Sequence, residues 1–140
     1  MPDLTHSTHP TTGSLPIIAD RDVVICRQTV RQIAAALQFS VTEQTMLVTA
    51  ASELARNTLI HGGGGRFSWE VVNEGSKRGI RLSFVDNGPG IADIERAMTN
   101  GWTSGKGLGL GLPGAKRLVN EFEIQSMVGR GTRVVIARWR

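Results

Sequence analysis

The apolar positions of this chain repeat at helical spacing in three segments. Over residues 22–38 they form one stripe with a polar face opposite, which predicts an amphipathic helix. Ser40 and Glu43 then have the spacing of a capping box, which predicts a second helix that runs up to the glycines at 62–65. A third long helix is expected over 112–122, because a proline suits its first turn and apolar residues follow at helical spacing.

Other segments alternate between apolar and polar residues, which is the period of a β-strand. A turn is expected over 73–79, and the glycine-rich stretch 99–111 has no period and predicts a loop. Three main helices with largely hairpin-connected strands predict an α+β fold, a two-layer sandwich with a mixed, mostly antiparallel sheet. The expected strands cover 15–19, 67–72, 80–85, 122–128 and 131–139, and a short helix is expected over 92–98.

The first residues differ from the rest of the chain in composition. Residues 1–14 are polar and include prolines and threonines, so burial cannot offset the cost of ordering them, and we expect a disordered tail. His6 and His9 lie there and are interpreted as solvated residues rather than metal ligands. Residues 15–140 are expected to form a single domain. The chain has neither a signal-peptide pattern nor an apolar run of transmembrane length, so we expect a cytoplasmic protein without a membrane partner.

Composition narrows the class of protein. The chain has 140 residues, a net charge of +4, 40% apolar and 20% charged residues, which is typical of one globular domain. Cys26 is the one cysteine, so the chain by itself cannot form a disulfide or a cysteine-based metal site, and we expect Cys26 to be buried. Most of the cations are arginine, but the few aromatic residues do not alternate with them, which argues against nucleic-acid binding.

The run GLGLGLPG at 107–114 contains a literal G-x-G-x-x-G. A dinucleotide-binding site of that kind needs a strand directly before the glycines and an acidic residue about 20 positions later, and a polar loop precedes this run instead. What remains is a set of glycines that leads into a helix, where free N–H groups attract anions, with Lys106 as an added cation. The alternative is a loop that is merely flexible.

Two polar residues lie one helical turn apart on the second helix. Glu53 and Asn57 flank its apolar face, together with His61 a further turn on. A carboxylate suits a general base, and a carboxamide oxygen suits Mg²⁺. The alternative is a solvated glutamate with an asparagine near the end of the helix.

The segment VDNGPGI at 85–91 follows a predicted strand. Asp86 would lie at the end of that strand, where its carboxylate can accept a hydrogen bond from an exocyclic amine such as that of adenine. Gly88 and Gly90 would then leave room for a flat base to approach. The alternative is an ordinary β-turn.

Taken in order, these segments resemble the GHKL ATPase/kinase superfamily over residues 15–140. ELARN at 53–57 resembles its N-box, DNGPG at 86–90 its adenine box, GLGLG at 107–111 its second glycine box, and GT at 131–132 its closing Gly-Thr. Each motif alone is weak, but four in the same order at compatible spacing are specific.

Within that superfamily the chain resembles small, stand-alone kinases of sigma-factor regulation. In 140 residues we expect neither the long lids and further domains of the gyrase, Hsp90 and MutL relatives nor the helix pair with an acceptor histidine that sensor histidine kinases need. ELARNTLIHGGGG at 53–65 and GLGLPGAKRLVNEFEI at 109–124 resemble the RsbT-type switch kinases of the stressosome, and the RsbW-type anti-sigma-factor kinases are similar.

The resemblance implies ATP and Mg²⁺ as cofactors and a role for each matching residue. Asp86 would bind the adenine amino group with Thr132 nearby, Asn57 would hold Mg²⁺, and Glu53 would be the general base of phosphoryl transfer. The glycine box would close over the phosphates as a lid. The residues implied in nucleotide binding are Asn57, Asp86, Gly88, Gly90, Lys106, Gly107, Leu108, Gly109, Leu110, Gly111 and Thr132.

The resemblance also implies partners. The chain would phosphorylate a serine or threonine of a STAS-domain protein and then activate a PP2C-type phosphatase, and it would be a monomer when free. The alternative is an anti-sigma factor or a nucleotide-gated binding module that sequesters a regulatory partner, but a pure binder has no need of Glu53 beside Asn57. Arg56 is expected on the outer face of the second helix, where it is either a partner or phosphate contact or a solvated residue. Trp102 is either a partner contact or an anchor of its loop, and His61 is alternatively a packing residue at the helix end.

Overall fold

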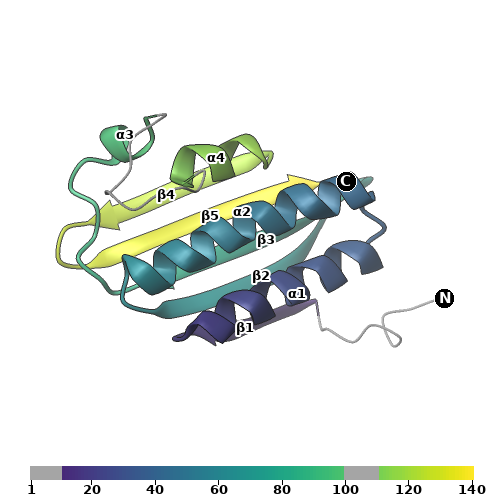
Figure 1. Ribbon diagram of the computed structural model, residues 1–140. Helices are drawn as coiled ribbons and strands as arrows, with labels where there is room; N and C mark the ends of the chain where they lie inside the picture. The colour runs from purple at the N-terminus through teal and green to yellow at the C-terminus, as the bar shows by residue number, and fades with distance from the viewer. Residues whose placement is uncertain (1–10, 100–110) are drawn as a thin grey trace.

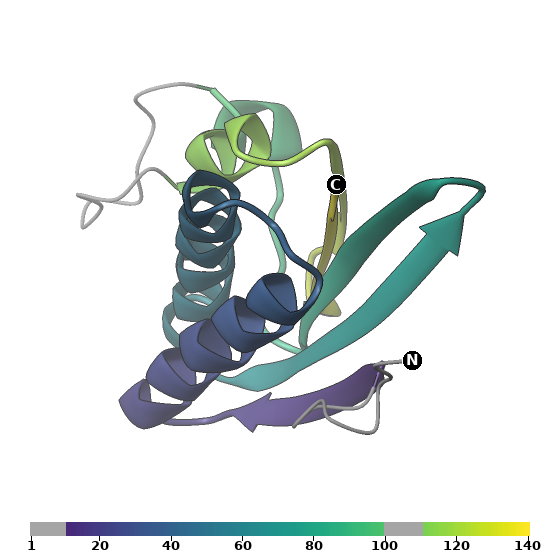
Figure 2. The same ribbon diagram turned by 90° about the vertical axis from the view of Figure 1, so that its right-hand side faces the viewer.

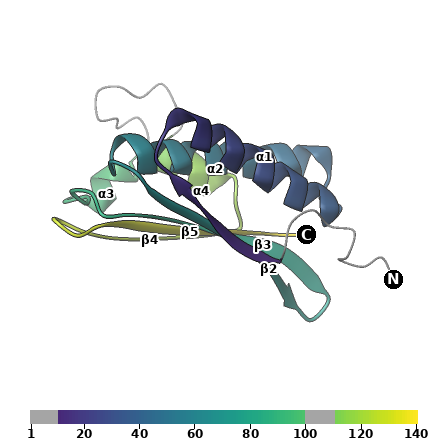
Figure 3. The same cartoon turned by 90° about the horizontal axis from the view of Figure 1, so that it is seen from below.

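The computed structural model describes residues 11–99 and 111–140. They form two layers, a five-stranded sheet and a layer of helices against one of its faces (Figures 1 and 2). The view from below in Figure 3 shows the helices on the same side of the sheet. The strands are β1 (Thr12–Ile17), β2 (Gly65–Glu74), β3 (Lys77–Asp86), β4 (Glu121–Met127) and β5 (Gly131–Trp139), and the helices are α1 (Asp20–Ala36), α2 (Val41–Ile60), α3 (Ile94–Ala97) and α4 (Gly111–Arg117). The expected α+β two-layer sandwich is confirmed.

The described strands pair in the order β1-β2-β3-β5-β4, and each pairing is antiparallel. β4 and β5 form the expected hairpin. Since β5 lies between β3 and β4 and is antiparallel to both, β3 and β4 run in the same direction. The chain between them, which carries α3 and α4, is therefore a crossover, and it returns α4 to the helical layer beside α2 (Figure 1).

The core lies between the sheet and the two long helices. Phe67 of β2 is directly opposite Phe84 of β3, and their rings stack with centroids 5.3 Å apart. Both side chains are fully buried, as is Leu54 on the facing side of α2. Cys26 of α1 is only 1% exposed, which confirms its expected place in the core, and this burial raises the pKa of its thiol to about 12.

Carboxylates cap the start of both long helices. At α1, Asp22 accepts hydrogen bonds from the N–H groups of Ile18 and Ala19, and these bonds lower the pKa of its carboxyl group. At α2 the expected capping box is present: Ser40 Oγ accepts the N–H of Glu43 at 3.1 Å, and Glu43 accepts the N–H of Ser40. The two helices expected over 22–38 and up to 60 are thus confirmed within two residues.

Two boundaries near the start of the sheet differ from the sequence prediction. β1 begins at Thr12, so residues 12–14 belong to the sheet and not to a disordered tail. Only one face of this strand is buried, and its first residues are polar, so their composition resembles that of a tail. The turn between β2 and β3 contains only Gly75 and Ser76, much shorter than the expected 73–79. The polar residues on either side continue the ladder as an exposed hairpin.

The third helix is shorter than expected. α4 ends at Arg117, and Phe122 belongs to β4, opposite Ile136. The chain joins the sheet early because the Asn120 N–H donates to the Ala137 carbonyl at 2.9 Å. An apolar side chain at 122 fits either a helix stripe or the inner face of a strand, and the pairing with β5 decides between them.

Several predictions fall on residues 1–10 and 100–110, which lie outside the described ranges. They concern the tail with His6 and His9, Trp102, and most of the glycine box. Within the described ranges, no helix has the length and apolar character needed to cross a membrane.

Removal of the capping hydroxyl of α2 should destabilise the fold. We expect Ser40→Ala to lower the free energy of unfolding by about 1 kcal/mol, because the N–H of Glu43 loses its acceptor. Urea denaturation measures this change. Ser76→Ala, in the exposed β2–β3 turn, is the matched control and should leave the unfolding midpoint nearly unchanged; equal midpoints for the two variants would contradict the capping role.

Candidate functional site

Several of the residues that the sequence singled out meet around Asp86, at one end of the sandwich. Asp86 is the last residue of β3 and pairs directly with Thr132 at the start of β5. Gly62, just beyond the end of α2, packs against the Asp86 side chain. The end of α2 and the ends of two strands therefore meet around Asp86, and the same helix carries Asn57 in its last turn and Glu53 one turn earlier.

Backbone packs closely around Asp86 on two sides. A Cβ atom at Gly62 would overlap the Asp86 carboxyl group, and one at Gly131 would overlap the Asp86 carbonyl oxygen. The half-buried carboxylate also accepts the Gly88 N–H through Oδ1 at 2.9 Å. These contacts fix the position of the carboxylate.

Gly88 and Gly90 hold the loop after β3 against the rest of the protein. A Cβ atom at Gly88 would lie 2.7 Å from the backbone of Gly62, and one at Gly90 would overlap the Met127 carbonyl oxygen. The loop is also tied to the β4–β5 hairpin by a 2.8 Å hydrogen bond from the Gly129 N–H to the Pro89 carbonyl. Both glycines therefore have a packing reason to lack a side chain, and their contact with a base stays a prediction.

Glu53 connects α2 to α4. Its half-buried carboxylate accepts the N–H of Gly111, the first residue of α4, at 3.2 Å through Oε2. Asn57 is also half-buried. Its backbone carbonyl oxygen accepts the N–H groups of His61 and Gly62, and these bonds close the end of the helix. Arg56 lies on the exposed face of α2, as expected from its position in the helix.

Sequence reasoning missed two residues of this locality. Gly62 was read only as part of a helix stop, and nothing local separates it from the three glycines that follow. Ser126 Oγ lies 2.8 Å from Thr132 Oγ1 and accepts the Ile91 N–H at 2.7 Å. A signal for Ser126 existed, since it occupies an inner-face position of β4 where the alternation calls for an apolar residue.

The remaining predicted nucleotide ligands lie outside the described residues: Lys106, Gly107, Leu108, Gly109 and Leu110. In the described part of the chain, no three His, Cys, Asp or Glu residues cluster as a metal site would require. A single carboxamide such as that of Asn57 still fits Mg²⁺, because this ion keeps several waters and is held largely by nucleotide phosphates.

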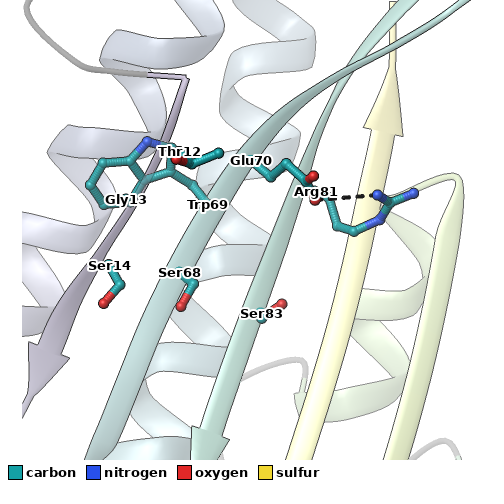
Figure 4. A pocket seen from close by; sticks show the side chains of 8 residues that line it. All are labelled: Thr12, Gly13, Ser14, Ser68, Trp69, Glu70, Arg81 and Ser83. Carbon is teal, nitrogen blue, oxygen red and sulfur yellow. Dashed lines mark hydrogen bonds and ion pairs between the residues drawn. The ribbon is translucent and has the colours of Figure 1, made fainter.

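A separate hollow of about 460 Å³ lies on the sheet and contains none of these residues. Figure 4 shows it from the side away from the helices, with Ser14, Ser68 and Ser83 on three neighbouring strands. Glu70 and Arg81 form an ion pair of 3.4 Å at its side. The three serines, of which Ser14 is exposed and the other two are half-buried, and the ion pair make this a polar surface that is distinct from the surroundings of Asp86.

Comparison with known proteins agrees with this geometry. The family described as histidine kinase-, DNA gyrase B-, and HSP90-like ATPase matches residues 42–140. The serine/threonine-protein kinase RsbT of Bacillus subtilis (strain 168) is 41% identical over 88% of this chain and 92% of its own length. An anti-sigma F factor of Thermoanaerobacter sp. (strain X514) is 30% identical over 81% of this chain and 82% of its own length.

Solved structures share the fold at low sequence identity. The RsbU and RsbW domains of a Mycobacterium tuberculosis protein superpose with a TM-score of 0.62 at 21% identity, over 91% of this chain and 33% of that one. The resemblance inferred from the four motifs is confirmed. This chain belongs to the family of histidine kinase-, DNA gyrase B-, and HSP90-like ATPases.

Proposed function

We propose that this chain is an ATP-dependent kinase that phosphorylates a serine or threonine of a STAS-domain antagonist or scaffold protein. One observation carries the proposal: Glu53 and Asn57 lie one turn apart on the helix whose end packs against Asp86. A carboxylate for the base and a carboxamide for the metal thus lie on a helix that leads to a carboxylate for the nucleotide base, in a member of an ATPase family. The 41% identity to a serine/threonine-protein kinase supports the same activity.

Each residue has a task in this proposal. Asp86 accepts a hydrogen bond from the adenine amino group, with Thr132 beside it in register. Asn57 contributes an oxygen ligand to Mg²⁺, which neutralises charge on the phosphates of ATP. Because phosphoryl transfer depends mainly on positioning and charge neutralisation, the protein has little covalent chemistry to perform.

Glu53 takes the proton from the attacking hydroxyl group. Its Oε2 accepts the Gly111 N–H, and within the described residues no hydrogen bond uses Oε1. The base can therefore receive a proton while the other oxygen keeps its contact with α4. The glycine box, which includes Gly111, closes over the phosphates in this proposal.

The partners are proposed from the RsbT-type resemblance. After its substrate is phosphorylated, the kinase is released and activates a PP2C-type phosphatase, and it acts in the cytoplasm as a monomer when free. The anti-sigma F factor relatives support a second candidate, in which the chain sequesters a sigma factor or another regulator. Phosphoryl transfer to a STAS-domain protein separates the two candidates.

Incubation with labelled ATP and candidate STAS-domain proteins tests the activity. We expect transfer to a serine or threonine of one of them. Glu53→Gln should reduce the rate of transfer about a hundredfold or more, because glutamine keeps the shape of the side chain but is a poor base. ATP binding by this variant should persist. Transfer at a near wild-type rate by Glu53→Gln would show that Glu53 is not the base.

Asp86→Asn should weaken ATP binding by at least about tenfold, because a charge-assisted hydrogen bond to the adenine amino group is replaced by a neutral one. Isothermal titration calorimetry measures the dissociation constant. An unchanged affinity would remove Asp86 from the nucleotide site.

Gly62→Ala and Gly63→Ala form a matched pair. The methyl group at 62 would collide with the Asp86 carboxyl group, so we expect ATP affinity to fall at least about tenfold. At 63 there is open space but a φ of +74°, so we expect a loss of about 1 kcal/mol in unfolding free energy with ATP affinity retained. Equal ATP affinity of the two variants would contradict the placement of the Asp86 carboxyl group in the nucleotide site.

A further inference from the structure

The hydroxyl oxygen of Ser126 takes part in three hydrogen-bond contacts. This residue lies on β4 directly opposite Thr132, which in turn is directly opposite Asp86 on β3. These three residues form a row across the inner face of the sheet at the end where the nucleotide site is proposed. Ser126 is half-buried, and its Oγ makes three contacts: 2.7 Å to the Ile91 nitrogen, 3.0 Å to the Gly131 carbonyl oxygen and 2.8 Å to Thr132 Oγ1.

The chemistry of these partners determines where the hydrogens lie. The Ile91 N–H can only donate to Ser126, and the Gly131 carbonyl can only accept from it. The single hydrogen of Ser126 is therefore used on Gly131. For the third contact to be a hydrogen bond, the Thr132 hydroxyl must donate its own hydrogen to Ser126. Only this arrangement satisfies all three contacts.

Thr132 Oγ1 then has no hydrogen left for a ligand and can offer only lone pairs. Asp86, its neighbour in register, is an acceptor as well when ionised. Two acceptors side by side favour an amino group and disfavour a carbonyl oxygen. A 6-amino purine such as adenine meets this requirement, whereas a 6-oxo purine such as hypoxanthine or guanine places a carbonyl oxygen against one or both acceptors.

We infer that Ser126 is a positioning residue that holds the Thr132 hydroxyl as an acceptor and thereby strengthens selection of 6-amino over 6-oxo purine nucleotides. The inference rests on the proposed function, in which Asp86 and Thr132 face the base. Ser126 also ties Ile91, in the loop after β3, to β4. Any variant at 126 is therefore expected to change stability, and the test must measure selectivity.

The experiment compares the dissociation constants of ATP and ITP by calorimetry in the full chain. We expect Ser126→Ala to reduce the ratio of the ITP constant to the ATP constant about fivefold, because the freed Thr132 hydroxyl can rotate and donate to the 6-oxo group. Ser126→Thr keeps a hydroxyl and should keep the wild-type ratio. Ser68→Ala, the same change on the opposite face of the sheet, is the matched control and should also keep it.

A double-mutant cycle gives a second readout. Thr132→Val removes the hydroxyl that Ser126 orients, so in that background Ser126→Ala should leave the ratio unchanged.

A fallback variant is needed in case Ser126→Ala does not fold. Ser126→Cys forms weaker hydrogen bonds to the same partners, and we expect it to lower the ratio in the same direction. Weaker binding of both nucleotides by one common factor, with the ratio constant, would show that Ser126 is only structural. Absence of ATP binding by the wild-type chain would instead overturn the proposed function and this inference with it.

Discussion

The close approach of three backbone segments around Asp86 is the constraint on which the rest of this site depends. Gly62 beyond the end of α2, the loop after β3 and the first residue of β5 meet at distances that no side chain other than hydrogen permits. Gly62 and Gly131 give Asp86 a fixed position, and the hydrogen bond from Gly88 adds to it. A rigid carboxylate costs little reorganisation when it receives a ligand, which is the advantage of preorganisation in recognition.

The fold supplies the elements that make this approach possible. α2 is anchored at its start by the capping box and along its length by the core beneath it, so its last turn has a defined position over the sheet. The position of β5 between β3 and β4 brings Thr132 beside Asp86, although the two residues are far apart in the sequence. The crossover between β3 and β4 leaves this position open for β5. The site therefore depends on strand order as much as on the residues themselves.

The sequence predicted the parts of the fold that local patterns determine. The two long helices, the capping box at Ser40, and the strands of the two hairpins follow from periodicity and from turn residues that act over a few positions. The errors have a common origin in tertiary pairing. The third helix was extended to Phe122, where the expected strand also begins, because the pairing of that residue with Ile136 is not visible locally, and residues 12–14 were placed in a tail because their strand depends on β2.

The same distinction applies to the site. Glu53, Asn57 and Asp86 were identified because their residue types at that spacing match a known set of motifs, and the helix that carries the first two leads to the glycine packed against the third. The functions assigned to them stay proposals. Gly62 and Ser126 were not identified, since their roles come from contacts with residues that are distant in sequence.

The hydrogen bond between Glu53 and Gly111 links the position of the proposed base to the geometry at the start of α4. A movement of α4 away from α2 would leave Oε2 of Glu53 without its donor. A movement of the Glu53 side chain toward a substrate hydroxyl would likewise take the acceptor away from the Gly111 N–H. A single contact at 3.2 Å thus couples the chemical step of the proposed reaction to the conformation of the chain that follows the glycine box.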